Sequence, residues 1–598
     1  MRERAIRIGD FSGYLGDRFS AVDEVLAGDP VDVLIGDYLA EITLAALSVR
    51  YRRDPARGYV EYFVDQLRPH LATLAERRVK VVTNAGGFHP AALASALREL
   101  IAAEGVALCV AHVEGDNVLD RLPAYQRAGH RLENLDSGAA LAEWDAEPMA
   151  ANAYLGGWGI AEALASGADI VVCGRVTDAS LTSGPAAWWH GWGREDWDAL
   201  AGAVLAGHII ECGPHATGGN FSGFTRVPGM LVPGFPIAEI DAAGSSVITK
   251  HDHDGGTVTT DTVTAQIVYE IQGPAYLNPD VTVHLDEVAL ELDGPDRVRV
   301  TGTTGSPPPP TTKVAVFGQL GHQVVNTVFV TGLDVDAKVD LLRAQIGRDV
   351  PEGVTELDIT RIGTAAANPG TQWDATVGLR VMATAAEKAP LERFDAAARL
   401  GSLYLQSIPG YFHDGGAGLT STPRPRIDYW PALLPMSEVP HRLALPDGST
   451  VDVKPPVHTE PVAPQPVHAE PGKPVATGET RSAPLGLLAH ARSGDKGGNS
   501  NVGVWVSDDR AWPWLRDTLS TEALRALVPE CADLAVVRHE FPNLRAVHFV
   551  LRGLLGTGGS SNLRVDQVGK AVGEYLRAKH VTIPVELLPD EGGNHVAD

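Results

Sequence analysis

The stretch ADIVVCGRVTD at residues 168–178 decides the fold, because an apolar run rich in β-branched residues passes directly into polar side chains. Earlier stretches repeat this pattern: AIRIGD at 5–10, VDVLIGD at 31–37, VKVVTNAG at 79–86 and VALCVAHVEGD at 106–116. Ala- and Leu-rich helical patterns lie between them, as in HPAALASALRELIAAEG at 89–105 and NAYLGGWGIAEALASGA at 152–168. Strands that alternate with helices predict βαβ crossovers, and apolar strands are typical of a sheet covered on both faces. We therefore expect an α/β fold with a mostly parallel sheet.

The chain changes character between residues 245 and about 335. The stretches at 245–271 and 281–302 are rich in Val and Thr and alternate with period two, which predicts an antiparallel β-rich extension. A mixed region follows, with a helix expected at 336–346, a strand near 375–382 and a helix near 390–405. The C-terminal part predicts a small α+β domain, in which 485–507 is a strand–loop–strand and 565–578 is a helix.

A proline-rich segment separates two units. Residues 455–474 read PPVHTEPVAPQPVHAEPGKP, and seven of these twenty residues are proline. Proline lacks an amide donor and has a fixed φ, so we expect an extended, semi-rigid linker. The expected organisation is a large α/β domain at 1–445, a linker at 446–481 and a small α+β domain at 482–598.

Composition and charge limit the partners. The chain has 598 residues, of which 44% are hydrophobic and 21% charged, as in ordinary globular proteins. Lys and Arg number 49 against 75 Asp and Glu, so the net charge of −26 disfavours nucleic acid and anionic membrane surfaces. Four cysteines without a CxxC pair predict free thiols in a reducing compartment. The start does not resemble a signal peptide, and we expect a cytoplasmic protein that is a homo-oligomer.

Polar side chains follow each predicted strand. In open parallel sheets ligands bind beyond the carboxyl ends of the strands, so these groups should converge on one rim. They are Asp10, Ser12, Asp37, Thr83, Asn84, Glu114, Asp116, Arg175, Thr177 and Asp178, followed by Glu211 and Cys212 after a further expected strand. The alternative is that each one caps the following helix. We expect one cavity surrounded by Asp10, Asn84, Glu114, Arg175, Asp178 and Glu211.

Three loops on this rim carry the candidate chemistry. The glycines of GDFSGYLGD at 9–17 lack the spacing of a dinucleotide fold, but their amides could hold an anion. In GRVTDAS at 174–180, Arg175 can hold a carboxylate with two N–H groups, and Asp178 is either a general base or a helix cap. ECGPHATGGN at 211–220 combines an acid, a thiol and a His with a turn that can present amides to an oxyanion.

Two further segments are rich in polar residues. His251 and His253 of KHDHDGGT would share one face of a strand and suit a divalent ion, but a polar hairpin turn explains the same residues and is favoured. SGDKGGNS at 493–500 lacks the spacing of a nucleotide-binding loop. With His490 and Arg492 before it, this loop could bind an anion or a partner domain. The sequence defines no cofactor, and a divalent metal remains open.

In their order along the chain, these motifs resemble the acyclic terpene utilisation (AtuA-like) family. The resemblance is carried by GDFSGYLGDR, TNAGGFHP, VEGDN, ANAYLGGWGI, GADIVVCGRVTDAS, HIIECGPHATGGN and GFPIAEI. HARSGDKGGNSNVGVW and FPNLRAVHFVLRGLLG resemble the small C-terminal domain of that family, in which relatives often carry an acid at position 498. The family is named for terpene breakdown, where branched acids are processed as coenzyme A thioesters, so the resemblance implies a catabolic role.

Three functions are consistent with these features. The first is a hydratase or lyase that acts on a branched carboxylic acid or its coenzyme A thioester, with Asp178 or Glu211 as the base and Asp10 as a further catalytic candidate. The second is a metal- or anion-dependent hydrolase with Asp10, Asp37, Asp116 and Asp178 as ligands. The third is a non-catalytic subunit that organises other enzymes through its C-terminal domain. The candidates for substrate binding are Arg175, Ser12, Asn84, Glu114, Asp116, His215, Gly218, Gly219 and Asn220.

Overall fold

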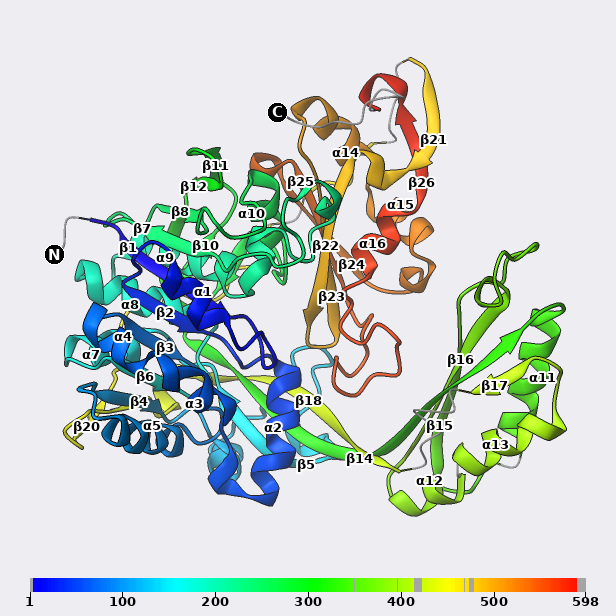
Figure 1. The fold of residues 1–598 in the computed structure, drawn as a ribbon, viewed down its shortest axis with the longest axis horizontal. Helices are drawn as coiled ribbons and strands as arrows, with labels where there is room; N and C mark the ends of the chain where they lie inside the picture. The colour runs from blue at the N-terminus through cyan, green and yellow to red at the C-terminus, as the bar shows by residue number, and fades with distance from the viewer. Residues whose placement is uncertain are drawn as a thin grey trace.

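The computed structural model describes residues 4–348, 350–394, 396–413, 422–466, 468–472 and 478–588. These residues form a large α/β body, an arm that projects from it and a smaller C-terminal domain beside the body (Figure 1). None of the helices within these ranges is both long and apolar enough to cross a membrane. The four cysteines are free thiols, as expected.

The centre of the body is a parallel sheet made by all five strands predicted in the first 180 residues. The pairs β1–β2, β2–β3, β3–β6 and β6–β4 are parallel. The carboxyl ends of these strands therefore lie at one edge of the sheet. The strands are β1 (Ile6–Ser12), β2 (Val33–Gly36), β3 (Lys80–Thr83), β4 (Val110–Glu114) and β6 (Ile170–Cys173).

The parallel pairing stops on both sides of this centre. β7 joins β1 in antiparallel pairing and is followed by β8, β12 and β11, while β19 joins β4 and is followed by β20. The prediction of a mostly parallel sheet is thus right only for the centre, because strands from later in the chain join both edges of it in antiparallel pairing. The added strands are β7 (Ile237–Ile240), β8 (Ser246–Thr249), β11 (Ala289–Leu292), β12 (Arg297–Thr301), β19 (Arg442–Ala444) and β20 (Thr450–Asp452).

Helices cover both faces of this sheet. One buried cluster joins Phe11, Leu34 and Val172 to helices α1–α5, and another joins Ile8 and Val171 to α7–α9. α5 (Pro90–Glu104) starts with a proline that has no amide to leave unbonded, and it ends at Gly105 with φ +68°. The other helices are α1 (Ala21–Ala27), α2 (Glu41–Arg53), α3 (Tyr62–Leu67), α4 (Leu71–Arg77), α6 (Leu122–Arg127), α7 (Trp158–Ala165), α8 (Ser180–His190) and α9 (Trp197–Ile210).

The stretch 245–271 departs from the antiparallel pattern that its sequence predicts. After β8 and a turn, Thr260–Ile267 forms helix α10. The Thr262 amide donates to the Thr259 hydroxyl (3.2 Å), and the Thr259 amide donates to the Thr262 hydroxyl (3.0 Å). This reciprocal cap starts a helix in a Val- and Thr-rich stretch whose alternation indicates a strand. Antiparallel strands follow as predicted: β9 (Ala275–Leu277), β10 (Thr282–His284), β11, β12 and β13 (Thr304–Ser306).

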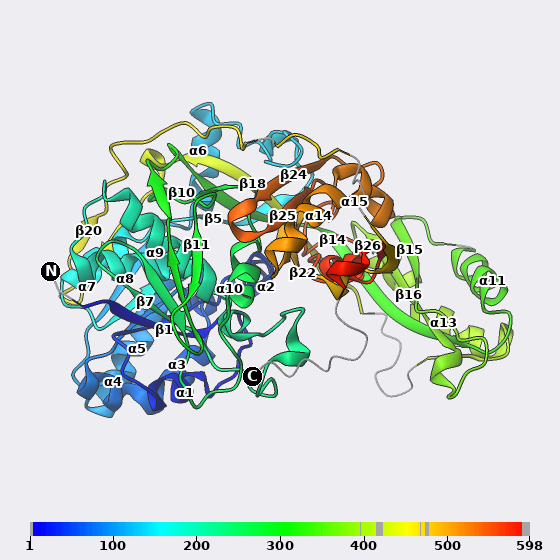
Figure 2. The ribbon, with the colours of Figure 1, turned by 90° about the horizontal axis from the view of Figure 1, so that it is seen from above.

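The arm grows out of one long strand, β14 (Thr311–Thr331). β14 pairs with β5 (Glu147–Ala153) and β18 (Arg424–Pro435) near the body, and further along with β16 and β17 (Figures 1 and 2). The helix predicted at 336–346 and the strand predicted at 375–382 are present, whereas the helix predicted at 390–405 is two helices. The remaining arm elements are α11 (Val335–Gly347), β15 (Val354–Ile362), β16 (Thr376–Ala385), α12 (Lys388–Phe394), α13 (Ala396–Gln406) and β17 (Tyr411–His413).

The C-terminal domain is a small α+β unit. Its antiparallel sheet has the order β22-β23-β25-β24, and β21 pairs with β26. The predicted strand–loop–strand is the β22–β23 hairpin, whereas the helix predicted at 565–578 is limited to α16. The elements are β21 (Thr480–Pro484), β22 (Ala489–Lys496), β23 (Asn499–Val506), α14 (Trp512–Thr518), α15 (Thr521–Leu527), β24 (Val536–Phe541), β25 (Ala546–Leu551), α16 (Val572–Arg577) and β26 (His580–Pro584).

The C-terminal domain is attached to the body through α10 and through the segment 446–481. Asn501 Nδ2 donates to the Val268 carbonyl (3.1 Å), next to the end of α10. Gln465 exchanges two hydrogen bonds with the Ala275 backbone, at 2.7 and 3.0 Å. Residues 467 and 473–477 of the expected linker lie outside the described residues. This packing directs the β22–β23 turn toward the middle of the molecule (Figure 1).

Candidate functional site

The ends of β1, β2 and β3 bring together a first group of buried polar side chains. Asp37 Oδ1 accepts hydrogen bonds from Asn84 Nδ2 (2.6 Å) and from the Leu39 amide (3.1 Å). The Ser12 hydroxyl donates to the Asp37 carbonyl (3.1 Å), and the Ser12 amide donates to Asp10 (3.3 Å). Burial raises the pKa of Asp10 well above its ordinary value. The rim predicted from the strand ends therefore exists over these three strands.

Asp116 shapes the loop after β6. Its Oδ2 accepts the Arg175 amide (2.7 Å) and Asn152 Nδ2 (2.7 Å). Burial raises its pKa to about 6, against the effect of these hydrogen bonds. A Cβ at Gly174 would lie 2.4 Å from Asp116, so only glycine allows this approach. Asp116 is thus a support for the Arg175 backbone.

The Arg175 side chain lies almost fully buried, with 2% of it accessible. Its guanidinium donates to the Leu39 carbonyl and lies 4.1 Å from the centre of the Tyr154 ring. Nη1 is 2.9 Å from Asp178 Oδ1. Asp178 therefore pairs with Arg175 and does not serve as the side-chain cap of α8, which was one of its two expected roles.

Glu211 follows a helix, and the expectation that it ends a strand is wrong. It is the C-cap of α9, a helix whose residues from Ala199 to Ile210 are all buried. His208 Nδ1 lies 3.2 Å from Glu211 Oε1, whereas Oε2 has no hydrogen-bond partner among the described residues. Burial, and then the charge of Asp178, raises the pKa of Glu211 well above its ordinary value. Glu211 is a carboxyl group that retains its proton at higher pH than usual.

A second set of charges comes from β14 and α2. Lys313 Nζ lies 2.8 Å from Glu41 Oε1, which also accepts the Tyr154 hydroxyl (2.7 Å). Burial disfavours both charges, but their attraction outweighs it: Lys313 holds the pKa of Glu41 well below its ordinary value, and Glu41 holds that of Lys313 above. The Tyr154 ring lies against both Lys313 and Arg175. Tyr154 therefore connects this pair with the strand-end rim.

The C-terminal domain supplies a third set. Lys570 Nζ lies 2.8 Å from Glu270 Oε1 and 3.8 Å from Asp495 Oδ1, and it donates to the Tyr269 hydroxyl. Lys496, the last residue of β22, lies 3.9 Å from the other Glu270 oxygen. Glu270 follows α10 in the body, so two cations of one domain meet an acid of the other.

These three sets act on one another electrostatically where the body meets the C-terminal domain, and together we call them the interdomain site. The charges of Asp178, Glu270 and Lys496 all act on the Glu211 carboxyl, and those of Glu41 and Lys313 act on Lys496. The Arg175 and Glu211 side chains are 2% and 8% accessible, and those of the other members are 20–33% accessible. Burial lowers the pKa of Lys570 to about 8. The members are Glu41, Arg175, Asp178, Glu211, Glu270, Lys313, Asp495, Lys496 and Lys570.

The loop 211–220 has a different role from the one expected. The Gly218 and Gly219 amides donate to carbonyls of the same loop, at 3.4 and 2.8 Å, so they do not face an oxyanion. Arg492 of the C-terminal domain instead contacts this loop, through His215 Nδ1 (2.8 Å) and the Asn220 carbonyl (3.0 Å). His215, Gly218, Gly219 and Asn220 thus form a docking point for the C-terminal domain. The amides of Gly13 and Gly16 are similarly bonded, to Asp17 and to the Tyr62 hydroxyl.

Glu114 does not belong to the site. It ends β4 and pairs with Arg442 of β19 (3.2 Å), because an antiparallel strand covers this edge of the sheet. The structure therefore corrects the expectation that all six strand-end residues share one cavity.

The carboxylates proposed as metal ligands do not form a metal site. Within the described ranges, no three or more His, Cys, Asp or Glu side chains gather in a way that could hold an ion. Asp37 and Asp116 use their oxygens for backbone and amide donors. His251, part of the alternative His pair, donates to the Val25 carbonyl (2.9 Å) and accepts the Asp29 amide (3.2 Å). The favoured interpretation of 250–257 as a turn agrees with these contacts.

Sequence reasoning missed Glu41, Glu270, Lys313 and Lys570. They follow no predicted strand end and belong to no short motif, and only long-range packing brings them together. A weak signal exists for Lys313, a lone cation in an apolar strand. Lys496 lies in the donor-rich loop 493–500 that the sequence singled out. Two partners were expected for that loop, an anion or a partner domain, and the structure shows contacts with the other domain.

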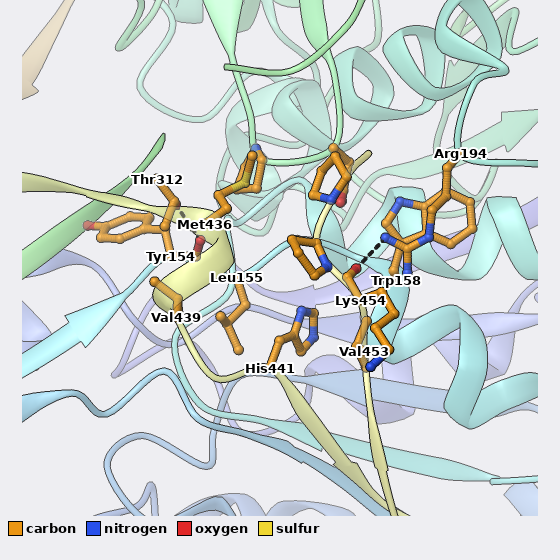
Figure 3. A pocket seen from close by; sticks show the side chains of 15 residues that line it. Tyr154, Leu155, Trp158, Arg194, Thr312, Met436, Val439, His441, Val453 and Lys454 are labelled. Carbon is orange, nitrogen blue, oxygen red and sulfur yellow. Dashed lines mark hydrogen bonds between the residues drawn. The ribbon is translucent and has the colours of Figure 1, made fainter. Parts of the chain in front are cut away.

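A small cavity lies beside Tyr154, and Figure 3 draws the side chains that line it. It has a volume of about 40 Å³, enough for a few water molecules. His441 and Trp158 line it, and Arg194 closes one side by donating to the Lys454 carbonyl (2.6 Å) (Figure 3). Burial lowers the pKa of His441 to about 3, so this His is neutral. The cavity is too small for an organic substrate.

Comparisons with known proteins agree with this architecture. The family model described as "Acyclic terpene utilisation family protein AtuA" matches residues 6–445, which include the body and the arm. The model described as "AtuA ferredoxin-like domain" matches residues 483–582, the C-terminal domain. No curated protein and no solved structure matches the chain. The chain therefore belongs to the acyclic terpene utilisation AtuA family and carries its ferredoxin-like domain.

Proposed function

We propose that this protein is an enzyme that acts on a branched or terpenoid-derived carboxylic acid, or on its coenzyme A thioester, by hydratase- or lyase-type acid–base chemistry. The observation that carries the proposal is Glu211, whose buried Oε2 lacks a partner among the described residues, while the cations Lys496 and Arg175 lie within electrostatic reach of the carboxyl. A carboxyl with a raised pKa holds its proton to higher pH than an ordinary carboxyl, which suits general acid–base catalysis.

The surrounding charges suit a reaction next to a carbonyl or carboxylate. Arg175 and Lys313 are held on the body side, and Lys496 and Lys570 on the other. Cations positioned around a substrate stabilise negative charge that develops on its oxygen atoms during proton transfer. Among the expected catalytic residues, Glu211 takes the proton-transfer role. Asp178 is engaged by Arg175, and Asp10, whose Oδ2 also lacks a partner among the described residues, is influenced by the acids Asp17 and Asp37 and by no cation.

The alternative functions have less support from the geometry. The hydrolase hypothesis depended on aspartates that support the backbone. The organising-subunit hypothesis used the C-terminal domain for docking to other enzymes, but its β22–β23 hairpin contributes Lys496 to the interdomain site.

Deuterium exchange tests the proton-transfer step by itself. The protein is incubated in D₂O with branched unsaturated, 3-hydroxylated and saturated acyl-CoA thioesters and the free acids, and products are analysed by mass spectrometry. We expect deuterium uptake or a water-addition product with the wild type, and a loss of about 100-fold or more in Glu211→Gln. Glu76→Gln, at an exposed helix position remote in sequence from the site residues, is the control. Equal rates in Glu211→Gln and wild type would contradict the assignment.

A further inference from the structure

Lys496 differs from the other cations of the interdomain site in its pairing. Arg175, Lys313 and Lys570 each have a carboxylate oxygen within 2.9 Å. The Lys496 ammonium reaches only Glu270, at 3.9 Å, and makes no hydrogen bond to any residue that the structure describes. An ammonium group has three donors, and one that is desolvated without acceptors is unfavourable. Lys496 therefore has donors to offer to a bound molecule.

The fold holds Lys496 in place through the turn that follows it. Gly497 adopts φ +64°, a conformation that favours glycine. Asp136 of the body accepts the Gly498 amide (2.9 Å) and Asn499 Nδ2 (2.6 Å). Asn499 Oδ1 in turn accepts the Gly553 amide (2.9 Å). The turn is thus bonded on both sides, and the hairpin cannot swing away without breaking these contacts.

The same turn explains the residue at position 498. A Cβ there would lie 2.3 Å from the Gly556 carbonyl oxygen, so any side chain at this position would displace the neighbouring loop. With glycine, the turn packs against both Asp136 and the 553–556 loop. The turn therefore supports the lysine, and no negative charge from position 498 competes for its ammonium.

The charges around Lys496 come from both domains. Glu270 and Glu41 lie on the body side, and their attraction, with that of Tyr276, raises the pKa of Lys496 against the effect of burial and of Lys313. Glu211 also lies within its electrostatic reach. The proposed proton carrier and the Lys496 ammonium thus belong to the same interdomain site.

We propose that Lys496 binds the carboxylate of the substrate, so that the ferredoxin-like domain completes the site and the substrate class is an acid with a free carboxylate. This inference rests on the proposed function, since it takes the interdomain site as the place of reaction. Lys496 orients the acid by ion pairing and Glu211 moves the proton, so the two residues have separable effects.

Binding measurements can test Lys496 independently of catalysis. Isovalerate and its uncharged isostere isovaleramide are titrated into the full-length protein and followed by ligand-observed NMR, together with 3-methylglutarate as a dicarboxylate. We expect both carboxylates to bind and isovaleramide to bind more weakly. Lys496→Gln should weaken carboxylate binding by about 10- to 100-fold, the value of a hydrogen bond to a charged group. Lys496→Arg should retain most of the binding.

The controls separate this inference from the proposed function. Lys388→Gln, an exposed lysine on α12 of the arm, should bind like the wild type. Glu211→Gln should keep carboxylate binding while losing exchange activity. Unchanged binding in Lys496→Gln, or no carboxylate binding by the wild type, overturns the role of Lys496. Full activity in Glu211→Gln overturns the proposed function and leaves the binding result standing. Thermal unfolding of each variant verifies that it is folded.

Discussion

Replacing Glu211 with glutamine should stabilise the protein at neutral pH. In the folded protein, burial and then Asp178 raise the pKa of Glu211 well above 4.5, its ordinary value. Above pH 4.5 the unfolded chain releases this proton, while the folded chain still holds it. The wild type therefore loses free energy of unfolding, relative to a permanently neutral glutamine, as the pH rises toward the folded pKa.

The size of the effect follows from proton linkage. For one proton, the difference grows by about 1.4 kcal/mol per pH unit, from pH 4.5 up to the pKa in the folded protein. Between pH 5 and pH 7 the gain of Glu211→Gln over the wild type should therefore widen by up to about 3 kcal/mol. Glutamine keeps an oxygen for His208 Nδ1, so the contact at 3.2 Å is not lost.

Urea unfolding at pH 5, 6 and 7 measures this divergence without a substrate. Glu41→Gln is the matched control with the opposite sign, since Lys313 outweighs burial and lowers the pKa of Glu41. Ionised Glu41 contributes stability that is fully present above its unfolded pKa of about 4.5, so Glu41→Gln should be destabilised by a similar amount at pH 5, 6 and 7. Parallel pH profiles for Glu211→Gln and the wild type would refute the assignment of a raised pKa.

Three further outcomes are expected. Asp178→Asn should lower the free energy of unfolding by about 1–3 kcal/mol, less than for a fully buried pair because 31% of the Asp178 side chain is accessible. A fully stable Asp178→Asn would argue against the ion pair. Arg175→Lys should weaken substrate binding. One thiol per chain should react rapidly with Ellman's reagent, and Cys109→Ser should remove it, because Cys109 is exposed while burial raises the pKa of Cys173, Cys212 and Cys531. Limited proteolysis should cut first at 447–480, and first cleavage inside 150–240 would contradict the domain boundary.

The elements that the sequence predicts well are those with a strong local pattern. The five central strands are continuous apolar runs, and Pro90 and Gly105 mark the ends of α5. The two wrong predictions of secondary structure, at α9 and α10, also have local causes. HIIE before Cys212 resembles a strand because α9 is buried on all sides and shows no amphipathic spacing. In α10, the reciprocal Thr259–Thr262 cap outweighs the preference of Val and Thr for strands.

The site residues that were predicted correctly also depend on a local pattern. Asp10, Asp37 and Asn84 were found because parallel strands necessarily bring their carboxyl ends to one edge. The same reasoning placed Glu114 in the site wrongly, because the antiparallel strand β19, from the end of the domain, covers it. Pairing between such distant segments leaves no pattern in the local sequence.

The sequence alone determined the family, the βαβ centre of the body, the small C-terminal domain and the strand-end rim, because each depends on short-range patterns or on an ordered set of motifs. Only the tertiary structure decided which charges meet. Lys313 reaches Glu41 from a distant strand, and Lys496 and Glu270 face each other because two domains pack together. Burial then sets the proton affinity of Glu211, and burial is a property of the packed chain that no single segment carries.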